Sequence, residues 1–214
     1  MNIIVVGASG RVGRACVRRL EAQGRHVIAC ARHLDGIEAS ELVTPVAFDM
    51  AAPLNAMITV FKDAQADAII FTAGSRGADV IHVDALGAIK TMEAAKGAGI
   101  KRYVLLGALF AAELERWDEP EVKRAIDQLP DYYPAKYFAD DHLMHSGLDY
   151  TIVEPGALVE EARTGAVNVD GRQTGPIAIE DVAAMLVDSL GQLGSVGRVY
   201  QIIQGDTPIA QALQ

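Results

Sequence analysis

The sequence predicts a doubly wound α/β fold, in which one parallel β-sheet is covered by helices on both faces. Short apolar runs alternate with helical patterns along most of the 214 residues, and strands buried on both faces read as such continuous runs. The segment GASGRVG at 7–13 follows the first apolar run directly, which is typical of a tight turn from a strand into a helix. Both observations favour a sheet whose ligand site lies at the carboxyl ends of the strands.

In the first half of the chain, four buried strands are expected at 2–6, 26–30, 44–50 and 66–74, the third with Pro45 at its start. A helix is expected after the first strand. Its apolar residues recur near helical spacing and a glycine offers a stop, at Val12, Cys16, Leu20 and Gly24.

In the second half, a helix passes through Leu86, Ile89 and Met92 and ends in KGAGI. Strands are expected at 101–108, 149–156 and 198–205, with a helix at 135–147 between the first two. A clear amphipathic helix lies before the last strand, where five apolar residues share one helical face: Val182, Met185, Leu186, Leu190 and Leu193.

Composition and charge restrict the partners. The net charge is −9 and the sequence has no basic block. This combination argues against non-specific electrostatic binding to nucleic acid. No apolar stretch approaches the roughly 20 residues that span a bilayer, and the start of the chain lacks a secretory pattern. We therefore expect a cytoplasmic protein with a single domain over 1–214, acting on a small molecule as a monomer or homodimer. Cys16 and Cys30 are expected to be reduced and buried.

The glycine segment predicts a phosphate cradle. Glycines at 7, 10 and 13 match G-x-x-G-x-x-G, whereas Ala8 breaks the stricter G-x-G-x-x-G pattern. Backbone N–H groups at the start of the following helix favour a pyrophosphate, although a turn without a ligand is the alternative. The residues expected at the cofactor are Gly7, Ser9, Gly10, Arg11, Val12 and Gly13.

The end of the second strand indicates which nicotinamide cofactor is preferred. The segment ACARH offers Arg32 and no carboxylate, and an arginine there accommodates a 2′-phosphate. We therefore expect NADP(H), with NAD(H) as the alternative, and Arg11 or His33 as helpers of Arg32. A solvated arginine without a ligand is the other interpretation.

Two further strand ends carry candidate cofactor contacts. Asp49 is positioned to accept a hydrogen bond from the adenine amino group, with Met50 against the ring. After the fourth strand, the small residues of TAGS would let the cofactor approach the backbone, at Ala73, Gly74 and Ser75.

The chain resembles the atypical short-chain dehydrogenase/reductase family, in its NAD(P)H-binding branch with sugar epimerase-like and NmrA-like proteins. The resemblance rests on GASGRVG and on two long strings, VDALGAIKTMEAAKGAGIKRYVLL and AKYFADDHLMHSGLDYTIVEPGAL, together with IAIEDVAAML and GDTPIAQAL near the end of the sequence. It implies an NAD(P)-binding Rossmann fold and adds Pro155 to the expected cofactor contacts. A small substrate region is expected from about 110–133 and 155–180.

The resemblance also implies a tyrosine and a lysine four residues later, with a serine after the fifth strand. YYPAK offers Tyr132 and Lys136, with Tyr133 as the rival tyrosine. Residues i and i+4 share one helix face, so the ammonium can assist the phenol in exchanging a proton. Pro134 fits only near the helix start.

The serine is missing, because Gly107 and Ala108 stand where relatives carry hydroxyls. A donor that polarises a substrate carbonyl is therefore lost, and only Thr72 or Ser75 could replace it. A flavin-reductase type of reaction would tolerate this loss best.

Three other features bear on the site. Trp117 or Phe110 could form a lid over the substrate, or the segment is a surface helix with an anchoring aromatic. His142 and His145 lack further ligands, so no metal is expected. Glu154 is expected near the pocket, where its charge would disfavour an anionic substrate.

The sequence thus favours an NADP(H)-dependent oxidoreductase that transfers hydride to or from a small organic or flavin-like substrate. A non-catalytic, NmrA-like cofactor sensor is the alternative, and an epimerase or dehydratase is a third.

Overall fold

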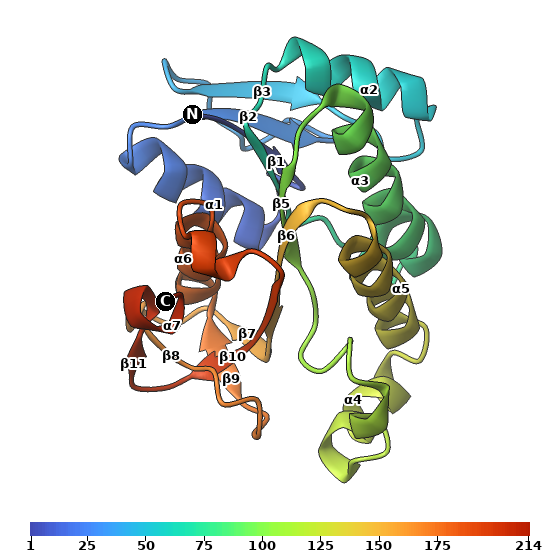
Figure 1. Ribbon diagram of the computed structural model, residues 1–214, viewed down its shortest axis with the longest axis vertical. Helices are drawn as coiled ribbons and strands as arrows, with labels where there is room; N and C mark the ends of the chain where they lie inside the picture. Colours follow the sequence, from blue (N-terminus) through green and yellow to red (C-terminus); the bar gives the residue numbers. More distant parts are fainter.

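The computed structural model describes residues 1–214 and contains a nine-stranded, mostly parallel sheet between two layers of helices (Figure 1). The strand order is β11-β8-β10-β6-β5-β4-β1-β2-β3. The parallel strands are β1 (Asn2–Val6), β2 (His26–Ala31), β3 (Val43–Ala47), β4 (Ala68–Phe71), β5 (Arg102–Leu106), β6 (Asp149–Pro155) and β10 (Arg198–Gln204). This arrangement confirms the doubly wound fold.

Helices cover both faces of the sheet. One face carries α1 (Arg11–Ala22), α6 (Ile179–Ser189) and the short α7 (Ile209–Ala212). The other carries α2 (Leu54–Asp63), α3 (Leu86–Ala98) and α5 (Tyr132–His145). The apolar strand residues alternate between these two layers, so both faces of the sheet are core. No helix has the length and apolar composition needed to cross a membrane.

The smaller elements lie toward the far end of the molecule. In Figure 1, α4 (Pro120–Gln128) lies beyond α5, opposite a group of short strands. There, β8 (Ala166–Asn168) pairs antiparallel with β10 and with β11 (Thr207–Pro208), and β7 (Ala157–Val159) pairs with β9 (Pro176–Ala178). Strands this short leave little periodicity, and the sequence did not predict them.

Several element boundaries differ from the sequence expectations. Pro45 lies in the middle of β3 instead of at its start, which is tolerated because β3 is the edge strand. The helix α2 was not predicted. Leu193 lies beyond α6 in a 3₁₀ turn (Leu193–Ser195) and is 91% exposed, so only its four partners form the buried face. A π-helical turn (Val80–Ala85) precedes α3 and was also not predicted.

Both cysteines are buried and unpaired, as expected. Burial raises the pKa of both thiols, Cys16 and Cys30, which keeps them protonated and unreactive.

Candidate functional site

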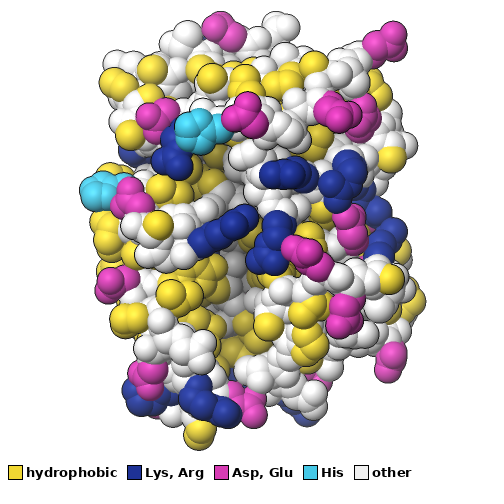
Figure 2. All heavy atoms as spheres, turned by 180° about the vertical axis from the view of Figure 1, so that it is seen from behind, with side chains coloured by type: hydrophobic (Ala, Val, Ile, Leu, Met, Phe, Trp, Pro, Cys, Tyr) yellow, Lys and Arg dark blue, Asp and Glu magenta, His cyan; other side chains and the backbone are white.

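A cavity of about 810 Å³ opens at the carboxyl ends of the central strands. It lies where β1 stands between β2 and β4, which is the point where the strand order changes direction. On the face seen in Figure 2, Lys and Arg side chains gather across the middle of the molecule, beside a hollow with hydrophobic side chains. A second cavity of about 610 Å³ lies among Asn2, His26 and Val60, at the opposite ends of the strands.

Most of the residues singled out from the sequence line the larger cavity together: Gly7, Ser9, Gly10, Arg11, Val12, Arg32, Asp49, Met50, Ala73, Gly74, Ser75, Tyr132 and Lys136. Gly13, Pro155 and His33 do not line it. The lining also includes residues that sequence reasoning missed, among them Arg76, His82, Asp84, Leu129 and Leu158.

In the glycine loop, the backbone packs closely against the backbone of neighbouring segments. Gly7 has a φ of +85°, and a Cβ there would lie 2.5 Å from the Ala73 nitrogen. A Cβ on Gly13 would lie 2.1 Å from the Gly7 carbonyl oxygen, so Gly13 acts by packing α1 onto the loop. Gly10 is the N-cap of α1, which has neither a side-chain cap nor an acidic residue in its first turn. The free N–H groups at this helix start fit a pyrophosphate.

At the rim of the cavity, Arg32 follows β2 and is exposed. Asp79 and His82 lie on the same rim, with 2.7 Å between His82 Nδ1 and Asp79 Oδ1. The His82 hydrogen bond, with a smaller contribution from the charge of Arg32, lowers the pKa of Asp79. Asp49 also lines the cavity, with Oδ1 accepting from the Ala51 backbone N–H at 2.9 Å. One Asp49 oxygen therefore remains for another donor.

The inner end of the cavity holds a buried lysine. The Lys136 side chain is 3% exposed, and its Nζ donates to the Leu106 carbonyl at 3.1 Å. Its nearest carboxylate is Asp84, 3.8 Å away and fully buried. Asp84 comes from the π-helical turn, and its Oδ2 accepts from Ser75 N–H at 2.9 Å and Ser75 Oγ at 2.7 Å. Asp84 Oδ1 has no hydrogen-bond partner, so Lys136 provides its compensating charge.

The helix start separates the two candidate tyrosines. Because α5 begins at Tyr132, Pro134 falls in its first turn, where a proline is tolerated. Tyr132 lines the cavity, and Lys136 Nζ lies 5.6 Å from the centre of its ring. Tyr133 instead packs edge-on against Trp117, with ring centres 6.0 Å apart, and burial raises its pKa to about 12.

The structure offers no free hydroxyl where the serine is missing. A Cβ on Gly107 would lie 3.0 Å from Glu154 Cγ and 3.2 Å from Ile152 Cγ2, and Ala108 is buried. Thr72 Oγ1 donates to the Val6 carbonyl at 3.0 Å, and Ser75 is bound to Asp84. Both hydroxyls therefore already have acceptors within the protein.

Glu154 is fully buried and does not line the cavity, so its carboxyl group does not face a substrate there, and its effect on anionic substrates stays a prediction. Its oxygens accept from the backbone N–H groups of Phe110 at 3.1 Å and Ala112 at 2.9 Å. Burial raises the pKa of Glu154 to about 7. Burial and the neighbouring Glu154 raise the pKa of Asp140 well above its usual range.

Asp140 carries two buried oxygens without an ordinary partner. A proton on Asp140 gives one of these oxygens an acceptor in Glu154, because the two backbone N–H groups stabilise the ionised form of Glu154.

The remaining candidates lie outside the cavity. The Phe110 ring is fully buried, and Trp117 packs against Tyr133 and Tyr137. Neither forms the cavity wall. His142 contacts Glu93 at 3.0 Å and His145 contacts Asp141, and no cluster of three or more His, Cys, Asp or Glu is arranged for a metal ion.

Comparisons with known proteins agree with this geometry. A family model described as NAD(P)H-binding matches residues 7–192. The chain is 37% identical to the uncharacterized sugar epimerase YhfK of Bacillus subtilis, over 100% of this chain and 99% of that protein. The crystal structure of the oxidoreductase ylbE from Lactococcus lactis has a TM-score of 0.92 and 36% identity, covering 100% of this chain and 95% of that one. ChuY, an anaerobillin reductase from Escherichia coli O157:H7, has a TM-score of 0.80 and 27% identity, covering 96% and 98%.

Proposed function

This chain belongs to the NAD(P)H-binding family of atypical short-chain dehydrogenase/reductase proteins, and on that basis we propose that it is an NADP(H)-dependent reductase of a conjugated, flavin-like acceptor. The cavity would bind the cofactor along the glycine loop. The acceptor would lie at its inner end, within a substrate region contributed by 110–133 and 155–180.

One observation carries the proposal: the buried Lys136 and the cavity-lining Tyr132 are present, and no free hydroxyl accompanies them. When bound, the reduced nicotinamide supplies a hydride. Tyr132 donates the accompanying proton, and the Lys136 ammonium, held by Leu106 and Asp84, stabilises the phenolate that remains. A delocalised acceptor spreads the incoming negative charge over its own ring system. It therefore depends less than a simple carbonyl on a localised donor.

The cofactor end supports the finer assignment to NADP(H). Arg32 is exposed at the rim after β2, where a guanidinium can bind a 2′-phosphate through paired hydrogen bonds. The uncapped start of α1 fits the pyrophosphate, and Asp49 with Met50 fits the adenine. ChuY, one of the relatives named as a reductase, is consistent with the direction of hydride transfer proposed here.

The direct test measures NADPH oxidation with a panel of flavins, quinones, conjugated enones, aldehydes and sugar derivatives. We expect turnover with the conjugated acceptors, and a loss of about 100-fold in kcat in Lys136→Met, because this variant removes the charge beside Tyr132. Lys123→Met, at an exposed position of α4, is the matched control. Turnover restricted to simple aldehydes would contradict the proposal.

The missing hydroxyl favours a second candidate, a cofactor-sensing protein without turnover. A serine at Gly107 would require a small shift of the Glu154 or Ile152 side chain, so the packing around this position does not favour the missing donor. Tight NADPH binding with no turnover on the whole panel would support the sensor. Conversion of a sugar derivative without net oxidation of NADPH would support an epimerase-like enzyme instead, because an epimerase returns the hydride to its substrate.

A further inference from the structure

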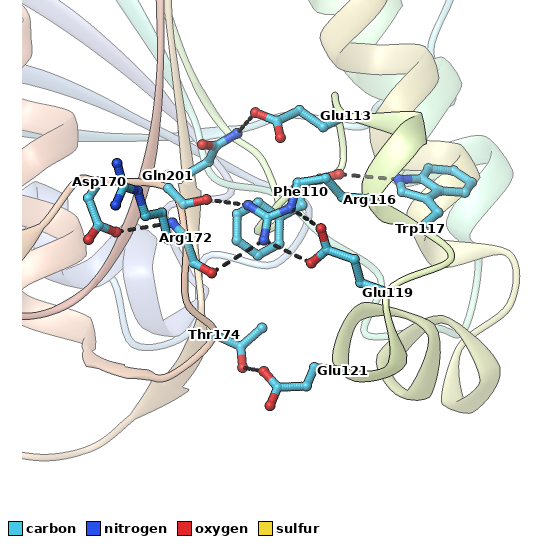
Figure 3. A network of polar contacts seen from close by, with 11 residues as sticks. Phe110, Glu113, Arg116, Trp117, Glu119, Glu121, Asp170, Arg172, Thr174 and Gln201 are labelled. Carbon is cyan, nitrogen blue, oxygen red and sulfur yellow. Dashed lines mark hydrogen bonds and ion pairs between the residues drawn. The ribbon is translucent and has the colours of Figure 1, made fainter.

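The two segments assigned to the substrate region contact each other chiefly through one arginine, Arg116. Segment 110–133 contributes Leu129 and Tyr132 to the cavity wall, and segment 155–180 contributes Leu158. Away from the cavity, Arg116 lies between the same two segments, and its side chain is only 15% exposed (Figure 3).

The Arg116 guanidinium donates hydrogen bonds both to its own segment and to the facing segment. Within its own segment it forms a two-pronged ion pair with Glu119, with both N···O distances at 2.9 Å. Across the gap it donates to the backbone carbonyls of Gly171 and, at 3.4 Å, Arg172. Five fixed donors in one plane allow an arginine to make these contacts at once.

The same guanidinium also covers an aromatic ring that is unusually constrained. Arg116 Cζ lies 3.6 Å from the centre of the Phe110 ring. Phe110 has a φ of +63°, in the left-handed region that side chains rarely adopt. Glu154 accepts from the Phe110 N–H, and Trp117 Nε1 donates to the Phe110 carbonyl at 3.2 Å. Phe110 is therefore held on its backbone and on its ring.

Trp117 extends these contacts toward α5, the helix that carries Tyr132 and Lys136. Its ring packs on Tyr133 and Tyr137, in the first two turns of α5, and Tyr133 is the direct neighbour of Tyr132. Two smaller contacts join the same two sides of the gap: Thr174 donates to Glu121, and the β10 residue Gln201 donates to Glu113 (Figure 3). Arg116 is the residue at which the ring, the acidic partner and the facing loop all meet.

We propose that Arg116 is a positioning residue that fixes the distance between segments 110–128 and 170–174, and thereby sets the width of the substrate end and the placement of Tyr132. The proposal rests on the proposed function, because that function assigns the acceptor to this end of the cavity. Its consequence is selectivity for acceptor size. Loss of the guanidinium weakens binding of a small acceptor while the distant phosphate cradle stays intact.

The experiment compares Arg116→Ala, Arg116→Lys and the control Arg124→Ala. The control removes an exposed arginine of α4 whose side chain hydrogen-bonds to the Pro120 carbonyl of its own helix. For Arg116→Ala we expect the acceptor KM to rise about tenfold, with kcat reduced less and the Kd of NADPH unchanged. Arg116→Lys keeps the charge next to Glu119 but lacks the planar donors, so its KM should be intermediate. Thermal unfolding of each variant checks that it is folded.

Two readouts do not depend on turnover. Trp117 is the only tryptophan of the chain, and its ring nitrogen is hydrogen-bonded to the Phe110 carbonyl. Tryptophan fluorescence therefore reports directly on the contacts around Phe110 and Arg116. In Arg116→Ala we expect an altered emission, together with faster hydrogen exchange in 110–119 and 169–174 at once. Arg124→Ala should show neither change.

The outcomes separate the two proposals. If the wild-type chain turns over no acceptor, the proposed function fails, and the exchange and fluorescence data alone decide on Arg116. If Arg116→Ala leaves the KM, the exchange of both segments and the emission within twofold of the wild type, Arg116 does not position the substrate end.

Discussion

The two ends of the cavity are built in different ways. At the cofactor end, backbone packs on backbone: Gly7 lies against the nitrogen of Ala73, and Gly13 lies against the carbonyl of Gly7. At the substrate end, side chains from distant parts of the sequence fix the structure, with Glu154 of β6 and Arg116 both acting on Phe110. The first end therefore depends on the absence of side chains, and the second on their charges. Each end should respond to a different kind of perturbation.

The largest effect is expected from Gly7→Ala. A Cβ would lie 2.5 Å from the Ala73 nitrogen on a backbone with a φ of +85°, so strain and overpacking add. We expect a loss of about 3 kcal/mol in the free energy of unfolding and loss of measurable NADPH binding. The matched control is Gly24→Ala, where φ is +68° but no atom lies within 4 Å. The control should cost about 1 kcal/mol and leave binding intact. Equal losses in a urea titration of both variants would show that packing contributes nothing.

A smaller effect at the same end is expected from Arg32→Ala. Removal of the guanidinium should raise the Kd of NADPH about tenfold and leave that of NADH unchanged, because only NADPH carries the 2′-phosphate. Titration calorimetry with both cofactors measures this difference. Arg18→Ala, which removes an exposed arginine paired with Glu180, controls for the change in net charge. If both dissociation constants stay the same in Arg32→Ala, the assignment to NADP(H) is wrong.

The smallest effect, and the one that distinguishes the substrate end, concerns pH. The folded chain binds the proton of the Asp140 and Glu154 pair more tightly than the unfolded chain does. The free energy of unfolding should therefore fall as pH rises from the ordinary glutamate value of 4.5 to about 7. Asp140→Asn replaces the protonated carboxyl with an amide donor for Glu154 and removes the titration of Asp140.

This variant no longer titrates at position 140, so its pH slope should be shallower than that of the wild type, and it should be at least as stable as the wild type at pH values above that range. Asp141→Asn, at the half-exposed neighbouring position, is the control and should keep the wild-type slope. Parallel slopes in Asp140→Asn and the wild type would exclude a shared proton. Chemical denaturation across the pH range gives the comparison.

The cofactor end could be predicted from the sequence because its signals are local. The strand, the glycine spacing and the helix start follow one another within 2–22, and parallel strands bring their carboxyl ends together automatically. Arg32, Asp49 and Gly74 each follow a strand, so fold class alone was enough to place them at one cavity. Tyr132 and Lys136 could be paired because the helical repeat relates them.

The substrate end could not be predicted in the same way. Asp84 reaches Lys136 because a π-helical turn positions it, and no residue pattern indicated that turn. The only signal for Asp84 in the sequence is a carboxylate within an apolar stretch. The sequence placed Glu154 near the pocket, whereas the buried pair with Asp140 depends on how α5 packs on β6. Arg116 meets Gly171 across 55 residues of chain, and no periodicity relates such positions.

The two prolines at the margins of the sheet have a consequence for the behaviour of the folded chain in concentrated solution. Pro45 lies within β3 and Pro208 within β11, which are the two outermost strands. Phe48 N–H donates inward to Ala31, and because successive residues alternate, the Pro45 nitrogen faces outward. An incoming strand would find no donor there. A proline in each of the two edge strands therefore disfavours edge-to-edge aggregation of this nine-stranded sheet.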